Sequence, residues 1–244
     1  MIKQLTRERY LEALLEGDRM VCRGIIEQAL QGGALAHHVY MEVIWPIMVE
    51  IDNLYRQDRI LPAQEALAAR INRSIVNQLQ NKLPRRPAVD KRIVIITTDS
   101  EQAELGGQMT CDLFESDGWQ CRFLGGTVNN EDILEFIHGF APDVLLLYGF
   151  NGKEAPAVRE LIDRIRQINA WPDMRIMLSG GVFKRAEGLW EEIGADLYAE
   201  TACEAVRMAS LPTDALPRPV RTIKQRSRIK KTVNCSPEST VAAR

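Results

Sequence analysis

The chain has few residues that bind metals through nitrogen or sulfur, and it has no long apolar run. It contains three histidines in 244 residues, and its five cysteines are widely spaced, without a Cys-x-x-Cys pair or a Cys/His cluster. This argues against a zinc site and a disulfide framework. No apolar run reaches the roughly 18 residues that span a bilayer, and the N-terminus lacks the apolar stretch of a signal peptide. We therefore expect a cytoplasmic protein without a membrane role.

Charge is unevenly divided along the chain. The formal net charge is −2, but residues 217–244 hold eight of the 31 Lys and Arg and one of the 33 Asp and Glu. Residues 1–216 therefore carry 23 basic and 32 acidic side chains, a net charge of −9. A basic tail on an acidic body can bind nucleic acid, bind an acidic partner, or stay solvated without a partner. These three interpretations stay open.

Residues 1–83 have the apolar periodicity of helices and are predicted to form a four-helix bundle, the cap domain. Asp18 is the expected N-cap of the second helix, which ends at Gly32-Gly33. Pro46 is expected to break or kink the third helix, and the fourth begins after Pro62.

After a polar, proline-containing linker at residues 84–91, short apolar strands alternate with helices. The predicted strands are 92–97, 120–124, 143–148, 174–179 and 196–198, and the predicted helices are roughly 104–117, 131–139, 154–169, 184–193 and 201–209. This pattern predicts a doubly wound α/β domain over 92–212, with a five-stranded parallel, Rossmann-like (flavodoxin-like) sheet. Residues 213–244 are predicted to be a disordered basic tail.

Glycines follow three of these strands, at the edge where an α/β sheet binds ligands. Gly106 follows the first strand, Gly149 the third and Gly180-Gly181 the fourth. Glycine lets a ligand approach the backbone, but βα turns also use glycine for their own geometry. A dinucleotide site fits poorly, because Gly-x-Gly-x-x-Gly is missing after the first strand. A receiver domain fits poorly too, since Asp143 begins its strand instead of ending it.

The loop after the first strand carries a more specific pattern. From Asp99 to Gly107 it reads Asp-Ser-Glu-Gln-Ala-Glu-Leu-Gly-Gly. With the later Gly-Gly, this resembles the signature of the cobalamin-binding domains, which is Asp-x-His-x-x-Gly, then Ser-x-Leu, then Gly-Gly. Glu101 takes the Asp position, Ala103 the His position and Gly106 the Gly position. The frame of the motif is kept, but the residue that ligates cobalt in the family is absent.

Two further stretches carry the resemblance. Tyr148-Gly149-Phe150 takes the Ser-x-Leu position, which in the family lines the groove for the nucleotide tail, and both aromatic residues are expected to fill that groove. In the bundle, the stretch from Glu50 to Ala66 resembles that of the cobalamin photoreceptor regulators: Tyr55 takes the position of a Trp, and Glu65 and Ala66 take those of a Glu-His pair that covers the corrin. The upper histidine is therefore missing as well.

The resemblance covers residues from about 6 to 210 and implies a site between the bundle and the strand-end loops. Without a histidine, a bound cobalamin is expected to keep its own base on the cobalt, and no catalytic or metal-ligating residue is assigned. The implied cofactor-binding residues are Tyr55, Glu65, Ser100, Glu101, Gln102, Ala103, Gly106, Tyr148, Gly149, Phe150, Gly180 and Gly181.

The missing ligand favours a non-enzymatic regulatory or sensory protein that binds a tetrapyrrole or a regulatory protein partner at the interdomain cleft. A corrinoid carrier of a methyltransferase system is one alternative, although it would need a lower histidine. A haem-binding sensor is another, with His37, His38, Cys111 or Cys121 as candidate ligands. A chain without any cofactor, nucleic-acid binding through the tail, and a homo-oligomer also stay open.

Overall fold

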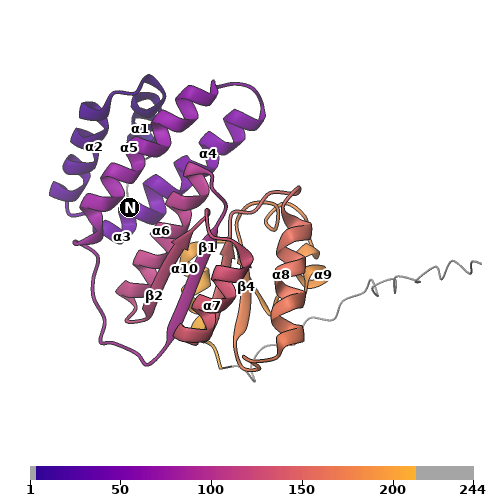
Figure 1. Ribbon diagram of the computed structural model, residues 1–244. Coiled ribbons are helices and arrows are strands. Elements are labelled where there is room, and N and C mark those ends of the chain that lie inside the picture. Colours follow the sequence, from indigo (N-terminus) through magenta and orange to yellow (C-terminus); the bar gives the residue numbers. More distant parts are fainter. Residues whose placement is uncertain (1–3, 213–244) are drawn as a thin grey trace, which may run out of the picture.

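The computed structural model describes residues 4–212, which form a helical cap joined to an α/β domain (Figure 1). The cap consists of α1 (Gln4–Glu16), α2 (Arg19–Gln31), α3 (Ala36–Val39), the π-helix η1 (Tyr40–Ile44), α4 (Trp45–Arg56) and α5 (Pro62–Gln80). Asp18 caps α2 as predicted, because its carboxylate accepts the N–H groups of Met20 and Val21, each at 3.0 Å. The interruption expected near Pro46 is the π-helical turn, and Pro46 lies in the first turn of α4, where its missing N–H is tolerated.

The α/β domain confirms the predicted fold class. Its elements are β1 (Arg92–Thr97), α6 (Glu101–Ser116), β2 (Gln120–Gly125), α7 (Asn130–Phe140), β3 (Val144–Tyr148), α8 (Ala155–Ile168), β4 (Arg175–Ser179), α9 (Leu189–Ile193), β5 (Leu197–Ala199) and α10 (Ala202–Ser210). The strands lie in the order β2-β1-β3-β4-β5, and every neighbouring pair is parallel. The carboxyl ends of β1, β3 and β4 therefore lie side by side.

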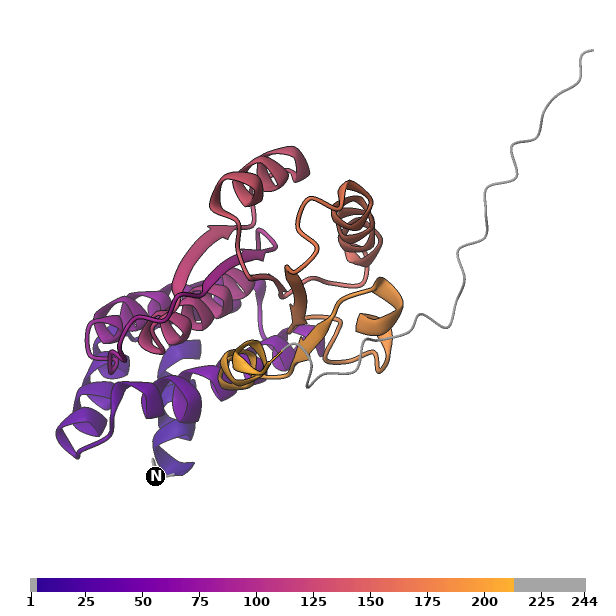
Figure 2. The same cartoon turned by 90° about the horizontal axis from the view of Figure 1, so that it is seen from below.

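The sheet separates two hydrophobic cores. In Figure 2, α6, α10 and the cap lie on one face of the sheet, and α7, α8 and α9 lie on the other. Side chains alternate between the faces along each strand. Ile93 and Ile95 of β1 pack in the core shared with the cap, whereas Val94 and Ile96 pack under α7 and α8. The position of a side chain along a strand thus decides in which of the two cores it packs.

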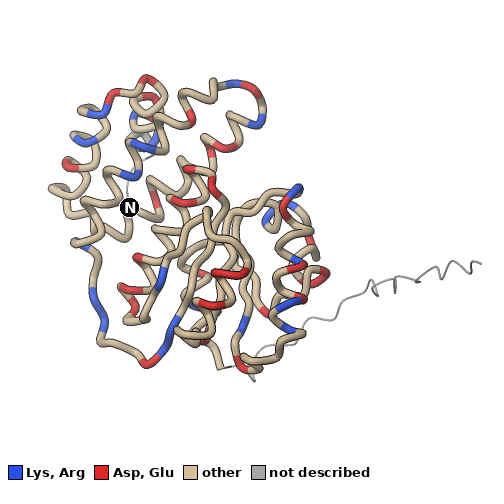
Figure 3. Tube along the Cα trace, viewed as in Figure 1, with Lys and Arg blue, Asp and Glu red and all other residues tan. Residues whose placement is uncertain are grey.

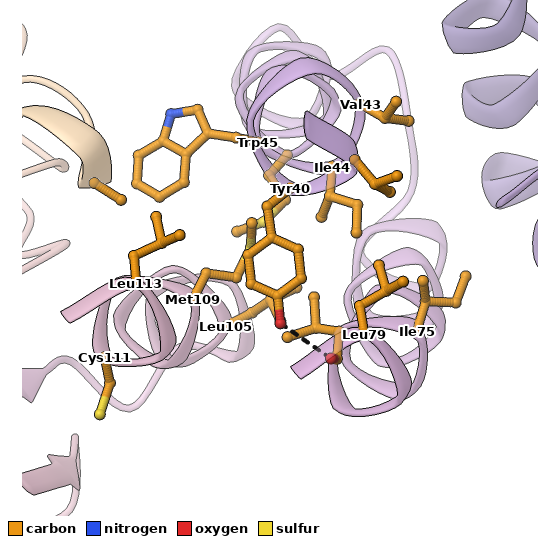
Figure 4. Packing of buried hydrophobic residues seen from close by; sticks show 14 of the residues in the cluster. Tyr40, Val43, Ile44, Trp45, Ile75, Leu79, Leu105, Met109, Cys111 and Leu113 are labelled. Atoms are coloured by element: carbon orange, nitrogen blue, oxygen red, sulfur yellow. Dashed lines mark hydrogen bonds between the residues drawn. The ribbon is translucent and has the colours of Figure 1, made fainter. Parts of the chain in front are cut away.

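Helix α6 belongs to the cap as much as to the sheet. Its residues Leu105 and Met109 are fully buried and point toward Tyr40 and Trp45 of the cap (Figure 4). The cap and the α/β domain therefore share one continuous apolar core, and α6 fixes how the two modules face each other.

A buried polar network reinforces this joint. The Tyr40 hydroxyl lies 2.9 Å from an Asp112 carboxylate oxygen and 3.0 Å from the Val76 carbonyl oxygen, and the Gln80 amide donates to Asp112 at 2.9 Å. Asp112 on α6 is only 3% exposed. Its carboxylate is hydrogen-bonded on both oxygens, as a buried charged group requires.

Two helix boundaries differ from the prediction. Helix α6 begins at Glu101, because the Ser100 hydroxyl accepts the N–H of Ala103 at 3.1 Å and caps it. Helix α9 begins only at Leu189, since Gly188 before it has φ +76° and interrupts the helical path.

Charged residues are interspersed over both modules, as the blue and red segments of Figure 3 show. The predicted disordered tail at 213–244, with its nucleic-acid hypothesis, lies outside the described residues. Within 4–212, no helix combines the length and the apolar character that crossing a membrane requires.

The Asp112 network predicts a pH dependence. Burial raises the pKa of Asp112 to about 6 from its ordinary 3.8, against the hydrogen bond from Tyr40. Between these values the folded chain keeps a proton that the unfolded chain has released, so stability falls as pH rises. The free energy of unfolding should lose about 3 kcal/mol to this group between about pH 4 and pH 7. Asp112→Asn should remove that loss, measured by urea unfolding across this range. An unchanged pH dependence in the variant would contradict the assignment.

Candidate functional site

The loops after β1, β3 and β4 meet at one edge of the sheet, where the sequence places its candidate residues. Gly149, Gly180 and Gly181 all have positive φ, at 81°, 66° and 56°. A Cβ on Gly181 would clash with the Phe150 carbonyl oxygen, and one on Gly149 would lie 2.7 Å from the Cβ of Ala103. These glycines are thus required by the packing of the loops on one another.

Ala103, at the position of the cobalt ligand, is buried in the first turn of α6. It is 5% exposed and packs against Gly149, so the space beside it is already filled. No group of three or more His, Cys, Asp or Glu side chains within residues 4–212 could hold a metal ion. Ala103 itself therefore offers a cobalt ion no donor atom.

Tyr148 fills the space beneath the loops. Its ring is 8% exposed and faces α6, where a Cβ on Gly106 would clash with the hydroxyl, and the loop after β4, where a Cβ on Gly180 would lie 3.0 Å from the ring. Trp45 of the cap meets it edge to face, with ring centroids 6.0 Å apart. Burial, and then the charge of Asp52, raises the pKa of the Tyr148 hydroxyl, which therefore stays protonated. Tyr148 is thus buried between these segments, and its place in a groove for the nucleotide tail stays a prediction.

Phe150 does not share this role, contrary to expectation. It packs in the core on the opposite face of the sheet, with α7 and α8. The reason is Gly149, whose left-handed backbone turns the chain after Tyr148. Residues 148 and 150 would point to the same face only in a continuous strand.

Glu101 faces away from Ala103. The two residues are two positions apart on α6, about 200° around the helix. Its carboxylate lies 3.2 Å from Arg73 and 3.8 Å from Arg70 on α5, and Arg73 also pairs with Glu104 at 3.1 Å. Glu101 therefore joins the cap to α6. Gln102, on the same turn, is half-buried.

The cap end of the site is polar. Glu65 lies in the first turn of α5, and burial, followed by the charge of Asp52, raises its pKa. Asp52 pairs with Arg56 at 2.8 Å and with Arg185, from the loop after β4, at 4.0 Å. We call Asp52, Arg56, Glu65 and Arg185 the cap latch. Tyr55, the predicted stacking residue, is 38% exposed next to it on α4.

Sequence reasoning missed Trp45, Asp52, Arg73 and Arg185. Each reaches its partner across the two modules, so no local pattern identifies it. Among the four, Trp45 alone has a sequence signal, because it directly precedes the predicted break at Pro46.

The candidate haem ligands are not gathered at this edge. His37 and His38 lie on α3 with ring centroids 3.9 Å apart, whereas Cys111 lies on α6 and Cys121 on β2. Burial, followed by the hydrogen bond between Cys121 and Cys111, raises the pKa of Cys121. A thiol with a raised pKa is a poor source of the thiolate that ligates iron.

Family models match both modules. Residues 6–80 match one model described as a B12 binding domain, and residues 91–207 match a second with the same description. Together the matches cover more than three quarters of the chain.

Relatives match in sequence and in structure. The chain is 24% identical over 165 residues to dimethylamine corrinoid protein 1 of Methanosarcina acetivorans. The aligned stretch covers 66% of this chain and 76% of the relative. It is 22% identical over 208 residues to monomethylamine corrinoid protein 2 of that organism, with coverages of 83% and 94%. The structure of the Methanosarcina barkeri monomethylamine corrinoid protein matches with TM-score 0.73 and 18% identity, over 85% of this chain and 98% of that one. At this identity the structural match supports the fold.

The packing around Ala103 predicts that an imidazole cannot simply be restored there. Ala103→His should destabilise the fold by about 1–3 kcal/mol, because the larger side chain must displace the Gly149 loop. Gln102→His is the matched control on the same, less buried turn and should change stability little. The midpoint of urea unfolding measures both. Equal stability of the two variants would show that the site has room for the ligand.

Proposed function

The chain belongs to the cobalamin-binding domain superfamily, and from this premise we propose that it is a corrinoid protein of a methyltransferase system. The observation that carries the proposal is the match of both modules, in order, to B12 binding domains. Cobalamin is the cofactor that these matches and the relatives support. The relatives are named as dimethylamine and monomethylamine corrinoid proteins, which supports a carrier role here.

The predicted regulatory or sensory role is wrong. Relatives that match most of this chain are corrinoid proteins named for methylamines, so the alternative of a corrinoid carrier takes its place. Such a carrier is not itself the catalyst, and its partner in this proposal is a methyltransferase. That partner would supply the site for the methyl donor or acceptor.

The residues present do not fit a corrinoid whose cobalt takes a nitrogen from the protein. Ala103 has no donor atom, and its surroundings are filled. The proposed place of the corrin ring is between Tyr55 and Glu65 of the cap and the loops after β1, β3 and β4. The proposed role of this chain is to hold and present the ring, and no residue of it is assigned to the methyl transfer.

The cap latch lies in the same place, so its ion pair between Arg185 and Asp52 must separate when the ring binds. Exposed ion pairs contribute about 0–1 kcal/mol each. The Arg185–Asp52 pair is long, at 4.0 Å, and both side chains are at least one third exposed. By contrast, a fully buried Leu or Met contributes about 1.5–3 kcal/mol, and Leu105 and Met109 hold the other end of the joint. The latch should therefore separate while the apolar joint stays packed.

Binding of cobalamin to the full chain tests the proposal directly. Hydroxocobalamin should form a one-to-one complex that survives gel filtration and has a visible spectrum distinct from the sum of its parts. Haemin is the comparison ligand and should not compete for the site. Absence of a complex with hydroxocobalamin or methylcobalamin would overturn the proposed function.

The latch predicts the effect of a single charge removal. Arg185→Ala should strengthen hydroxocobalamin binding about two- to fivefold, since it removes up to about 1 kcal/mol of competing contact. Arg164→Ala is the matched control, because it breaks the ion pair with Glu131 on the opposite face of the sheet. Calorimetric titration of both variants gives the affinities. Weaker binding by Arg185→Ala would instead make Arg185 a contact of the ligand.

A further inference from the structure

The inner side of the strand-end loops is occupied by an aromatic ring of the protein itself. Tyr148, at the end of β3, lies against Gly106 of α6 and Gly180 after β4. Trp45 of α4 closes the remaining side, with its ring plane at 63° to that of Tyr148. Two helices and the loop after β4 therefore enclose this ring, and Tyr148 is 8% exposed.

The first turn of α6 fills the space next to the loop after β3. Ala103 is 5% exposed and abuts the backbone of Gly149. Packed interiors have few voids larger than a water molecule. An aromatic base hanging below a corrin ring would therefore meet filled space both at Ala103 and at Tyr148.

We propose that this chain holds a corrinoid by its ring and leaves the nucleotide tail outside the α/β domain. The proposal rests on the proposed function, because it names the ligand class of the same site. That class is corrinoids irrespective of their tail: cobalamin with its own base on the cobalt, and cobinamide, which lacks the nucleotide. Tyr148 sets this range, because its ring occupies the space that a buried base would need.

The affinity ratio of two corrinoids tests this selectivity. Full-length protein is titrated at neutral pH with hydroxocobalamin and with aquacobinamide, followed by calorimetry and visible absorbance. The two dissociation constants should agree within about threefold, and bound cobalamin should keep its base-on spectrum. A preference for cobalamin of about tenfold or more, or a base-off spectrum, would overturn the inference and leave the proposed function standing. Binding of neither corrinoid would overturn both.

Substitution of Tyr148 assigns the effect to this residue. Tyr148→Ala opens the enclosed space and should raise the preference for cobalamin about tenfold, whereas Tyr148→Phe keeps the ring and should keep the wild-type ratio. Melting temperatures are measured in parallel, because the alanine variant loses a buried ring. If a folded Tyr148→Ala protein keeps the wild-type ratio, Tyr148 does not exclude the tail. Should the alanine variant not fold, the wild-type ratio and spectrum still decide the inference.

Discussion

Helix α6 is buried on two sides, and its packing fixes how the cap faces the strand-end loops of the α/β domain. One side packs on the sheet, and the other supplies Leu105 and Met109 to the core of the cap. Its N-terminal turn consequently lies at the edge where β1, β3 and β4 end. The residues of that turn are held by contacts with both modules, as the ion pair of Glu101 with Arg73 on α5 shows.

The same constraint explains how the loop frame persists without cobalt-ligating chemistry. Gly149 and Gly181 are needed because the loops after β3 and β4 cross closely, whatever the site binds. The carboxylate of Glu101 has an ordinary structural use, since Arg73 and Arg70 on α5 face it. Glycines and charges of the motif thus serve the fold, while ligation depends on a single side chain at Ala103. The architecture of this chain therefore does not depend on a ligating side chain at position 103.

The architecture was predictable because its signals are local. Apolar runs bounded by turn residues locate the strands to within about one residue, as for the strand predicted at 143–148 and found at Val144–Tyr148. The site was less predictable. The direction of Phe150 depends on one left-handed residue, Gly149, which reverses the alternation expected along a strand. Contacts such as Arg185 with Asp52 join distant segments, and no spacing in the sequence encodes them.

No nitrogen of this cobalamin-binding chain is expected to coordinate the cobalt of a bound cobalamin. Electron paramagnetic resonance of bound cob(II)alamin measures this directly, because a coordinated nitrogen splits the cobalt lines according to its nuclear spin. The experiment compares protein grown on natural nitrogen with protein grown on nitrogen-15, each loaded with the same unlabelled cobalamin. We expect identical three-line splitting in both samples, since the nitrogen belongs to the cofactor. A change from three lines to two in the labelled protein would place a protein nitrogen on the cobalt and contradict this expectation.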